Sequence, residues 1–156
     1  MTPAIEPDSS VDELYAHPPA EFIGRRDELA TAARAAGDSA AAARIKALRR
    51  PSVGAWYLNV AARDGLTSLR ELLRLGSQLR QAQAAADFGT LRELATQRGP
   101  LVGRVVRDLT AHLAQRGTRA TAAGLDEVRA TLASALADPG VADQLTTGRL
   151  DRAHRY

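Results

Sequence analysis

The chain has 156 residues, the length of a single domain, and alanine makes up about a fifth of it. The absence of cysteine excludes disulfides, cysteine-ligated zinc and a thiol nucleophile. Its 21 basic and 18 acidic residues give a net charge of +3, which permits contact with a polyanion without requiring it. Because alanine is the best helix former and aromatic residues are only 4% of the chain, the composition favours helices over sheets.

The first residues, 1–9, contain two prolines and few apolar groups, which predicts a disordered tail. The segment Ser10-Val-Asp-Glu13 matches a capping box and predicts a short helical turn that ends at His17-Pro18-Pro19. A helix is expected over 19–36, because proline suits the first turn of a helix. Gly37 would close it in the left-handed conformation.

Two shorter helices are expected next, over about 39–49 and 52–63. A polar side chain that can accept a backbone N–H precedes each helix, and a proline or a glycine follows each. These residues are Asp38 or Ser39 and Pro51 for the first helix, and Ser52 and Gly65 for the second.

Leucines at helical spacing predict a core helix over about 67–86, followed by a turn at Asp87-Phe-Gly-Thr90. The next helical pattern meets Gly99-Pro100. A proline inside a helix costs about 3 kcal/mol. We therefore expect either a kink at this point or two helices, near 90–98 and 100–116.

The end of the chain predicts one long and one short helix. The expected boundaries are Gly117, a cap at Thr121, a helix end at Ala137, a turn at Asp138-Pro-Gly140, a short helix through Leu145, and Gly148. The sequence thus predicts an all-α fold, a compact antiparallel bundle of about six to seven helices. It would form one domain over 10–148, followed by a polar tail at 149–156.

No catalytic, phosphate-loop or metal-binding motif occurs in the sequence. The three histidines, His17, His112 and His154, have no carboxylate at metal-ligand spacing, and His112 is typical of a half-buried helix residue. We therefore expect no enzyme activity, no metal and no cofactor. No segment resembles a signal peptide or reaches the roughly 20 apolar residues of a membrane helix, so a cytoplasmic location without membrane contact is expected.

The most informative stretch runs over 44–59, where a basic helix end, a Pro-Ser break and an aromatic helix start follow one another. Arginine binds phosphate through two parallel hydrogen bonds, and the N–H groups at a helix start favour an anion. The candidate residues for binding phosphate or a partner are Arg44, Lys46, Arg49, Arg50, Trp56 and Asn59, with Arg25 and Arg26 from the preceding helix.

Two other interpretations of this stretch stay open. It can form a degenerate helix-turn-helix, although a recognition helix over 52–59 would have no arginine or lysine to read base edges. More simply, the basic residues stabilise the dipole of a helix C-terminus, and Trp56 anchors the core.

Several short segments resemble an actinobacterial family of helical proteins. They are Val11-Asp-Glu-Leu-Tyr15, Pro19-Ala-Glu-Phe22, Arg26-Asp-Glu-Leu-Ala30, Ala35-Ala-Gly-Asp38, Ile45-Lys-Ala-Leu-Arg-Arg-Pro-Ser52, Ala55-Trp56 with Asn59, Leu125-Asp-Glu-Val128, Ala137-Asp-Pro139 and Gly148-Arg-Leu150. The resemblance covers most of the chain and implies a helical, cytoplasmic protein. Many members carry a longer C-terminal extension, so this chain would be a short member or an N-terminal module. The family has no established activity, and Gly99-Pro100 departs from its uninterrupted helix.

The sequence therefore supports three hypotheses of function. The leading one is a non-enzymatic helical interaction module that binds another macromolecule, preferably a protein, through an Arg-rich face. The second is nucleic-acid or nucleotide-phosphate binding through the same face. The third is an enzyme with dispersed active-site residues. The apolar stripes also leave open whether the helices close within one chain or across a homodimer.

Overall fold

A computed structural model describes residues 7–152, with side chains from Ser10 onward. All regular structure in this range is helical, and no strand occurs in it. Its nine helices are α1 (Pro7–Ala16), α2 (Pro19–Ala35), α3 (Ser39–Lys46), α4 (Val53–Arg63), α5 (Thr67–Ala84), α6 (Phe88–Ala95), α7 (Arg98–Gln115), α8 (Ala122–Ala137) and α9 (Pro139–Thr147). The all-α prediction is confirmed, and the helix count exceeds the six to seven expected.

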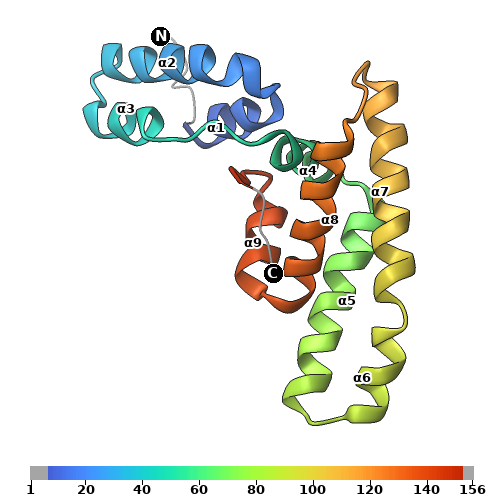
Figure 1. Cartoon of the computed structure of the whole chain (residues 1–156). Coiled ribbons are helices and arrows are strands. Elements are labelled where there is room, and N and C mark those ends of the chain that lie inside the picture. Colours follow the sequence, from blue (N-terminus) through green and yellow to red (C-terminus); the bar gives the residue numbers. More distant parts are fainter. Residues whose placement is uncertain (1–6, 153–156) are drawn as a thin grey trace.

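The bundle itself is built from α4 to α9. The long helices α5 and α7 run side by side in opposite directions, joined at one end by the short α6 (Figure 1). Helix α8 packs against α4, α5 and α7, and α9 folds back on α8. The apolar stripes of these helices meet in one core, whose fully buried members include Leu72, Leu109 and Leu132. The stripes therefore close within the chain.

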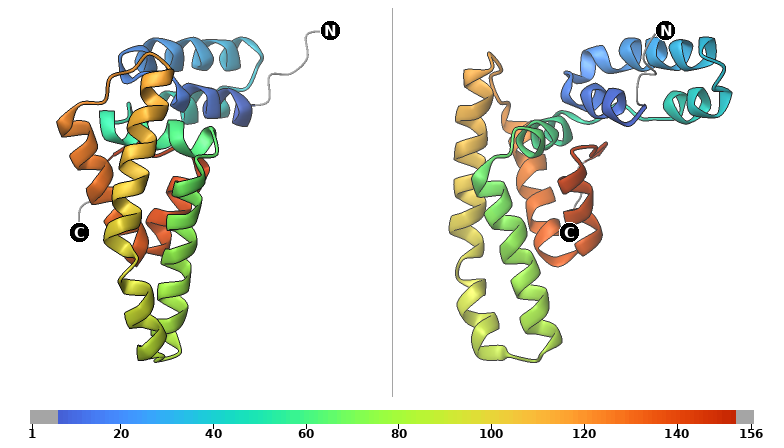
Figure 2. Two further views of the ribbon diagram at one scale, coloured as in Figure 1. Left: turned by 90° about the vertical axis from the view of Figure 1, so that its right-hand side faces the viewer. Right: turned by 180° about the vertical axis from the view of Figure 1, so that it is seen from behind.

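The first three helices form an arm at one end of the bundle. Helices α2 and α3 pack against each other, and α1 packs against both α2 and α4 (Figure 2). The arm has a small apolar cluster of its own, in which the rings of Tyr15 and Phe22 meet edge to face with centroids 5.2 Å apart. We call α1–α3 the N-terminal arm.

Most predicted helix ends are confirmed. Three side chains expected to cap helices accept a backbone N–H as predicted: Asp38 from Ala41, Ser52 from Ala55, and Thr121 from Gly124. The four glycines expected to close helices all have positive φ, between 68° and 85°: Gly37, Gly65, Gly117 and Gly148. These signals are local in the chain, so no knowledge of the packing was needed to find them.

The prediction for the first helix is wrong at its start. Helix α1 begins at Pro7, so Ser10 is its fourth residue and not its N-cap. Proline lacks the N–H group that a first turn leaves unpaired, which makes Pro7 a favourable starting residue. Residues 7–9 of the predicted tail are thus helical, and residues 1–6 lie outside the described residues.

Helix α3 is shorter than predicted, and the chain from Ala47 to Ser52 is not helical. The residue before a proline avoids the helical conformation, which forces Arg50 out of the helix ahead of Pro51. In addition, the carbonyl oxygen of Leu48 accepts a hydrogen bond from Arg26 Nη1 at 3.1 Å, outside any helical pattern.

Pro100 does not break a helix. The chain forms two helices, as one of the two alternatives required, but the break falls at Thr96-Gln97. Pro100 is the third residue of α7, within the first turn, where backbone N–H groups have no helical partner. A proline there sacrifices no hydrogen bond, so α7 accommodates it without a kink.

The predicted C-terminal tail is wrong for its first residues. Leu150 is only 1% exposed and belongs to the main core. The backbone oxygen of Asp151 accepts a hydrogen bond from the N–H of Ser52, and Arg149 Nε lies 2.6 Å from Asp12 Oδ1. This segment therefore ties α1 and α4 together, and residues 153–156 of the predicted tail lie outside the described residues.

Candidate functional site

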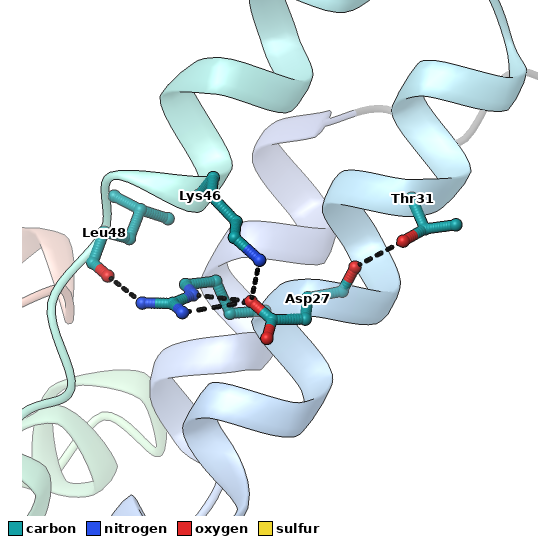
Figure 3. A network of polar contacts seen from close by, with 5 residues as sticks. Asp27, Thr31, Lys46 and Leu48 are labelled. Carbon is teal, nitrogen blue, oxygen red and sulfur yellow. Dashed lines mark hydrogen bonds and ion pairs between the residues drawn. The ribbon is translucent and has the colours of Figure 1, made fainter.

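Arg26 and Lys46, two of the predicted site residues, share a carboxylate with each other. Asp27 Oδ1 accepts hydrogen bonds from Arg26 Nε and Nη2 at 3.1 and 3.0 Å, and Lys46 Nζ lies 3.1 Å from the same oxygen (Figure 3). The hydrogen bond from Lys46 lowers the pKa of Asp27 most, followed by that from Arg26. Since Arg26 also binds the carbonyl oxygen of Leu48, this group holds α2 to the end of α3.

Trp56 and Asn59 lie inside the protein. Trp56 is 9% exposed, and its indole N–H donates to the carbonyl oxygen of Ala16 at 3.1 Å. Asn59 is 1% exposed and hydrogen-bonds both backbone groups of Leu150. These two residues join α4 to α1 and to the C-terminal segment. Their contacts are internal, so we do not include them in a binding surface.

The remaining predicted cations are exposed and spread over the arm. Arg25 lies on α2 with Glu21 at 3.9 Å, beside the groove between α1 and α2. Residues 44 and 46 are separated by about 200° around the axis of α3, because each helical residue advances about 100°. Arg44 and Lys46 thus lie on opposite flanks of α3. The structure does not bring the predicted set together in one site.

One part of the predicted set nevertheless remains a basic surface. Arg44, Arg49 and Arg50 are exposed, and none of them has an ion pair within residues 10–152. The segment 39–63 contains five basic residues and no acidic residue. We call Arg44, Arg49 and Arg50 the arm arginines.

The structure contains a groove between α7 and α8 that the sequence did not predict. Its volume is about 620 Å³, and it is lined by Arg98, Gly99, Val102 and Gly103 of α7 and Arg129, Ala133, Leu136 and Ala137 of α8. Small residues recur four apart on both helices, which places them on one face of each. The sequence shows that spacing, but it does not show that the two faces lie opposite each other.

A second opening, between α5 and α7, was also missed. Its volume is about 580 Å³. It is lined by Glu71, Arg74, Leu75 and Gln78 of α5, Thr96 and Gln97 of the α6–α7 link, and Pro100, Leu101, Arg104 and Arg107 of α7. Arg104 and Arg107 are one helical turn apart, but no pattern in the sequence indicates that Arg74 lies opposite them.

His112 contacts a carboxylate after all, from a residue 48 positions away. Its Nε2 lies 2.6 Å from Asp64 Oδ2, and Arg116 Nη1 lies 2.6 Å from the same oxygen. Partial burial alone would raise the pKa of Asp64, but the hydrogen bonds and charges of His112 and Arg116 outweigh it and lower the pKa. The cluster joins the end of α4 to the last turn of α7. His154 lies outside the described residues.

No group of three or more histidine, cysteine, aspartate or glutamate side chains in the described part of the chain could hold a metal ion. Within residues 7–152, no helix combines the length and the apolar character needed to cross a bilayer. Comparison of the chain with protein-family models, with curated proteins and with solved structures finds no match. The resemblance to an actinobacterial family therefore stays a prediction.

Proposed function

We propose that the chain is a non-enzymatic helical module that binds another protein, and that the partner lies in the groove between α7 and α8. The observation that carries this proposal is the lining of the groove. Six of its eight lining residues are glycine or apolar, and the two charged ones, Arg98 and Arg129, are arginines. An apolar floor with charged edges is the usual composition of a protein-binding surface.

The floor of the groove is open to close approach. A methyl group added at Gly99 would meet no atom within 4 Å, and one at Gly103 would meet only Arg107 Nη1, at 3.5 Å. Ala133 and Ala137 are exposed on the facing helix. A partner can therefore approach the backbones of both helices closely, and small side chains favour such close packing of a third helix.

The charges of the groove favour an acidic partner over a second copy of this chain. Arg98 has no ion pair within the described residues, and Arg129 is held only by Asp126 in an exposed pair, which contributes little. A two-fold contact between two such grooves would bring arginines against arginines, which is destabilising. A partner helix with apolar residues on one side and carboxylates at its edges would complement both features.

Photo-crosslinking tests this proposal. A photoreactive amino acid at position 133, inside the groove, should capture a discrete protein in the source cells, whereas the same amino acid at the exposed position 114 should not. The captured protein is then purified and its affinity measured. We expect Ala133→Glu to weaken binding at least tenfold and Ala114→Glu to leave it unchanged. Equal effects of the two variants would contradict a partner in the groove.

Nucleic-acid binding through the arm is the second candidate, and the acid-free segment 39–63 favours it. For duplex DNA, each neutralised phosphate contributes about 0.9 to the slope of log affinity against log salt. If the arm arginines contact phosphates, Arg49→Ala/Arg50→Ala should reduce this slope by about 2. Arg92→Ala/Arg119→Ala removes two exposed arginines elsewhere and is the matched control. The same loss in both double variants would identify non-specific attraction.

A further inference from the structure

The cleft between α5 and α7 gathers positive charge from two helices. Arg74 comes from α5, and Arg104 and Arg107 come from α7, while Glu71 is the only carboxylate in the lining. Leu75 and Leu101 in this lining are 2% and 8% exposed, which gives the cleft an apolar floor. Three guanidinium groups against one carboxylate leave an excess charge of +2 in one concave site.

Glu71 neutralises only one of the three cations. It forms an ion pair with Arg104 across the two helices. Arg74 and Arg107 have no ion pair within residues 10–152. Like charges that converge on one cleft repel each other, and an anion that entered between them would relieve this repulsion.

The donors around the cleft suit phosphate groups. Each guanidinium can donate two parallel hydrogen bonds to a phosphate, and no other side chain matches that geometry as well. Arg104 and Arg107 lie about 4.5 Å apart along the axis of α7, since each residue rises 1.5 Å. Arg74 faces them from α5, and Gln78 and Gln97 add neutral amide donors at the edge.

We propose that the α5–α7 cleft binds a small molecule that carries two or more linked phosphate groups. One phosphate would lie between Arg74 and Arg104, and the next would reach Arg107 along α7. This spread of donors favours linked phosphates over a single phosphate. The two openings share no lining residue, although the end of Arg107 also comes within 3.5 Å of the methyl position of Gly103 in the partner-binding groove, so the variants at Arg74 and Arg107 are tested against pyrophosphate alone.

The test is ligand-induced thermal stabilisation of the whole chain, because a ligand that binds only the folded state raises Tm. Pyrophosphate, ATP, inorganic phosphate and sulfate are compared at constant ionic strength. We expect a saturable rise of Tm with pyrophosphate and ATP, at concentrations at least tenfold lower than with phosphate or sulfate. Tighter binding of ATP would identify a nucleotide, and equal binding would identify the polyphosphate alone as the recognised group.

Substitutions then locate the site. Arg74→Ala/Arg107→Ala should raise the pyrophosphate concentration needed for half-maximal stabilisation at least tenfold. Arg92→Ala/Arg119→Ala changes the net charge equally and should leave it unchanged. Glu71→Gln removes the competing carboxylate and should lower the half-maximal pyrophosphate concentration severalfold. The proposal is wrong if pyrophosphate gives no saturable shift, or if the two double variants respond alike.

Discussion

The side-chain amide of Asn59 hydrogen-bonds both the N–H and the carbonyl oxygen of Leu150. Its Nδ2 donates to the carbonyl oxygen of Leu150 at 2.8 Å, and its Oδ1 accepts from the N–H of the same residue at 2.7 Å. Both residues are 1% exposed. The pair satisfies two buried backbone groups that have no helix to satisfy them, and it fixes the C-terminal segment against α4.

Replacing Asn59 should therefore be costly. Asn59→Ala leaves a buried N–H and a buried C=O without partners, and we expect a loss of about 2–4 kcal/mol in the free energy of unfolding. Urea denaturation followed by circular dichroism measures it. Gln115→Ala, at an exposed site, is the control and should change the free energy by less than about 0.5 kcal/mol.

Asn59→Asp adds a pH test of the same contact. An ionised carboxylate can accept from the N–H of Leu150 but cannot donate to its carbonyl oxygen. A protonated carboxyl group can do both. The stability deficit relative to the wild type should therefore shrink as the pH falls. A deficit that stays constant from neutral to acid pH would show that the lost donor is not what matters.

A second prediction compares two glycines with opposite surroundings, of which Gly124 lies where α8 packs against α4. A methyl group at Gly124 would lie 2.5 Å from Tyr57 Cε2, and the Tyr57 ring cannot retreat easily because its hydroxyl accepts from the N–H of Thr121 at 3.0 Å. We expect Gly124→Ala to destabilise the protein by about 1–3 kcal/mol.

The matched variant is Gly103→Ala, in the middle of α7. Its methyl group would meet only the flexible end of Arg107 at 3.5 Å, an ordinary contact. Because alanine is favoured over glycine inside a helix, we expect a gain of about 0.5–1 kcal/mol. Denaturation of both variants should give free-energy changes of opposite sign, and a loss at both positions would contradict the described packing.

Helix ends were predictable where the signal is local. A cap such as Ser52 acts on a residue three positions away, and Gly37 takes its conformation from the helix it closes. The contacts of the candidate site residues were harder to predict, because the partner of Asn59 lies 91 positions away in the chain. From the sequence alone, a buried structural amide and a binding residue look the same. The same holds for Arg26, whose partner Leu48 lies on the far side of the α2–α3 turn.

The two openings beside α7 could not be predicted for a related reason. Each depends on which helix faces which flank of α7. Periodicity locates the apolar stripe of α7 but does not say that α5 lies along one edge and α8 along the other. Arg74 and Arg107 thus meet in one cleft only once the packing is known.

Acid should weaken the contact between Asp64 and its two partners. The pKa of Asp64 is lowered in the folded protein from the ordinary value of 3.8. Its ion pairs therefore contribute stability at pH above that value and lose it as the pH falls through the lower, folded-state pKa. The contribution is at most about 1 kcal/mol, because the side chains are partly exposed to solvent.

Asp64→Asn tests whether the ion pairs of Asp64 lose their contribution to stability as the pH falls. The variant should be slightly less stable than the wild type at pH 7, and the difference should shrink as the pH falls below 3.8 and Asp64 takes up a proton. Asp108→Asn, which removes an exposed carboxylate without an ion pair among the described residues, is the control. A difference that grows as the pH falls would contradict a lowered pKa for Asp64.

The end of α5 predicts a stabilising substitution. Four helix ends share one hydrogen-bond pattern: the residue after the cap donates its N–H to the carbonyl oxygen three positions earlier, and the next residue donates to the carbonyl oxygen five positions earlier. At three of them the residue with positive φ is Gly37, Gly65 or Gly117, but at the fourth it is Ala86, with φ of 53°. A side chain in this conformation is strained by roughly 1–2 kcal/mol.

Ala86→Gly should relieve that strain. Glycine also gains freedom in the unfolded chain, which offsets part of the benefit, so we expect a net gain of about 0.5–1 kcal/mol. Ala85→Gly is the matched control, because Ala85 has an ordinary φ of −83° and the substitution there brings only the entropic cost. Thermal unfolding should therefore show a higher Tm for Ala86→Gly and a lower Tm for Ala85→Gly. If both glycines lower the Tm alike, Ala86 does not carry the strain that its φ implies.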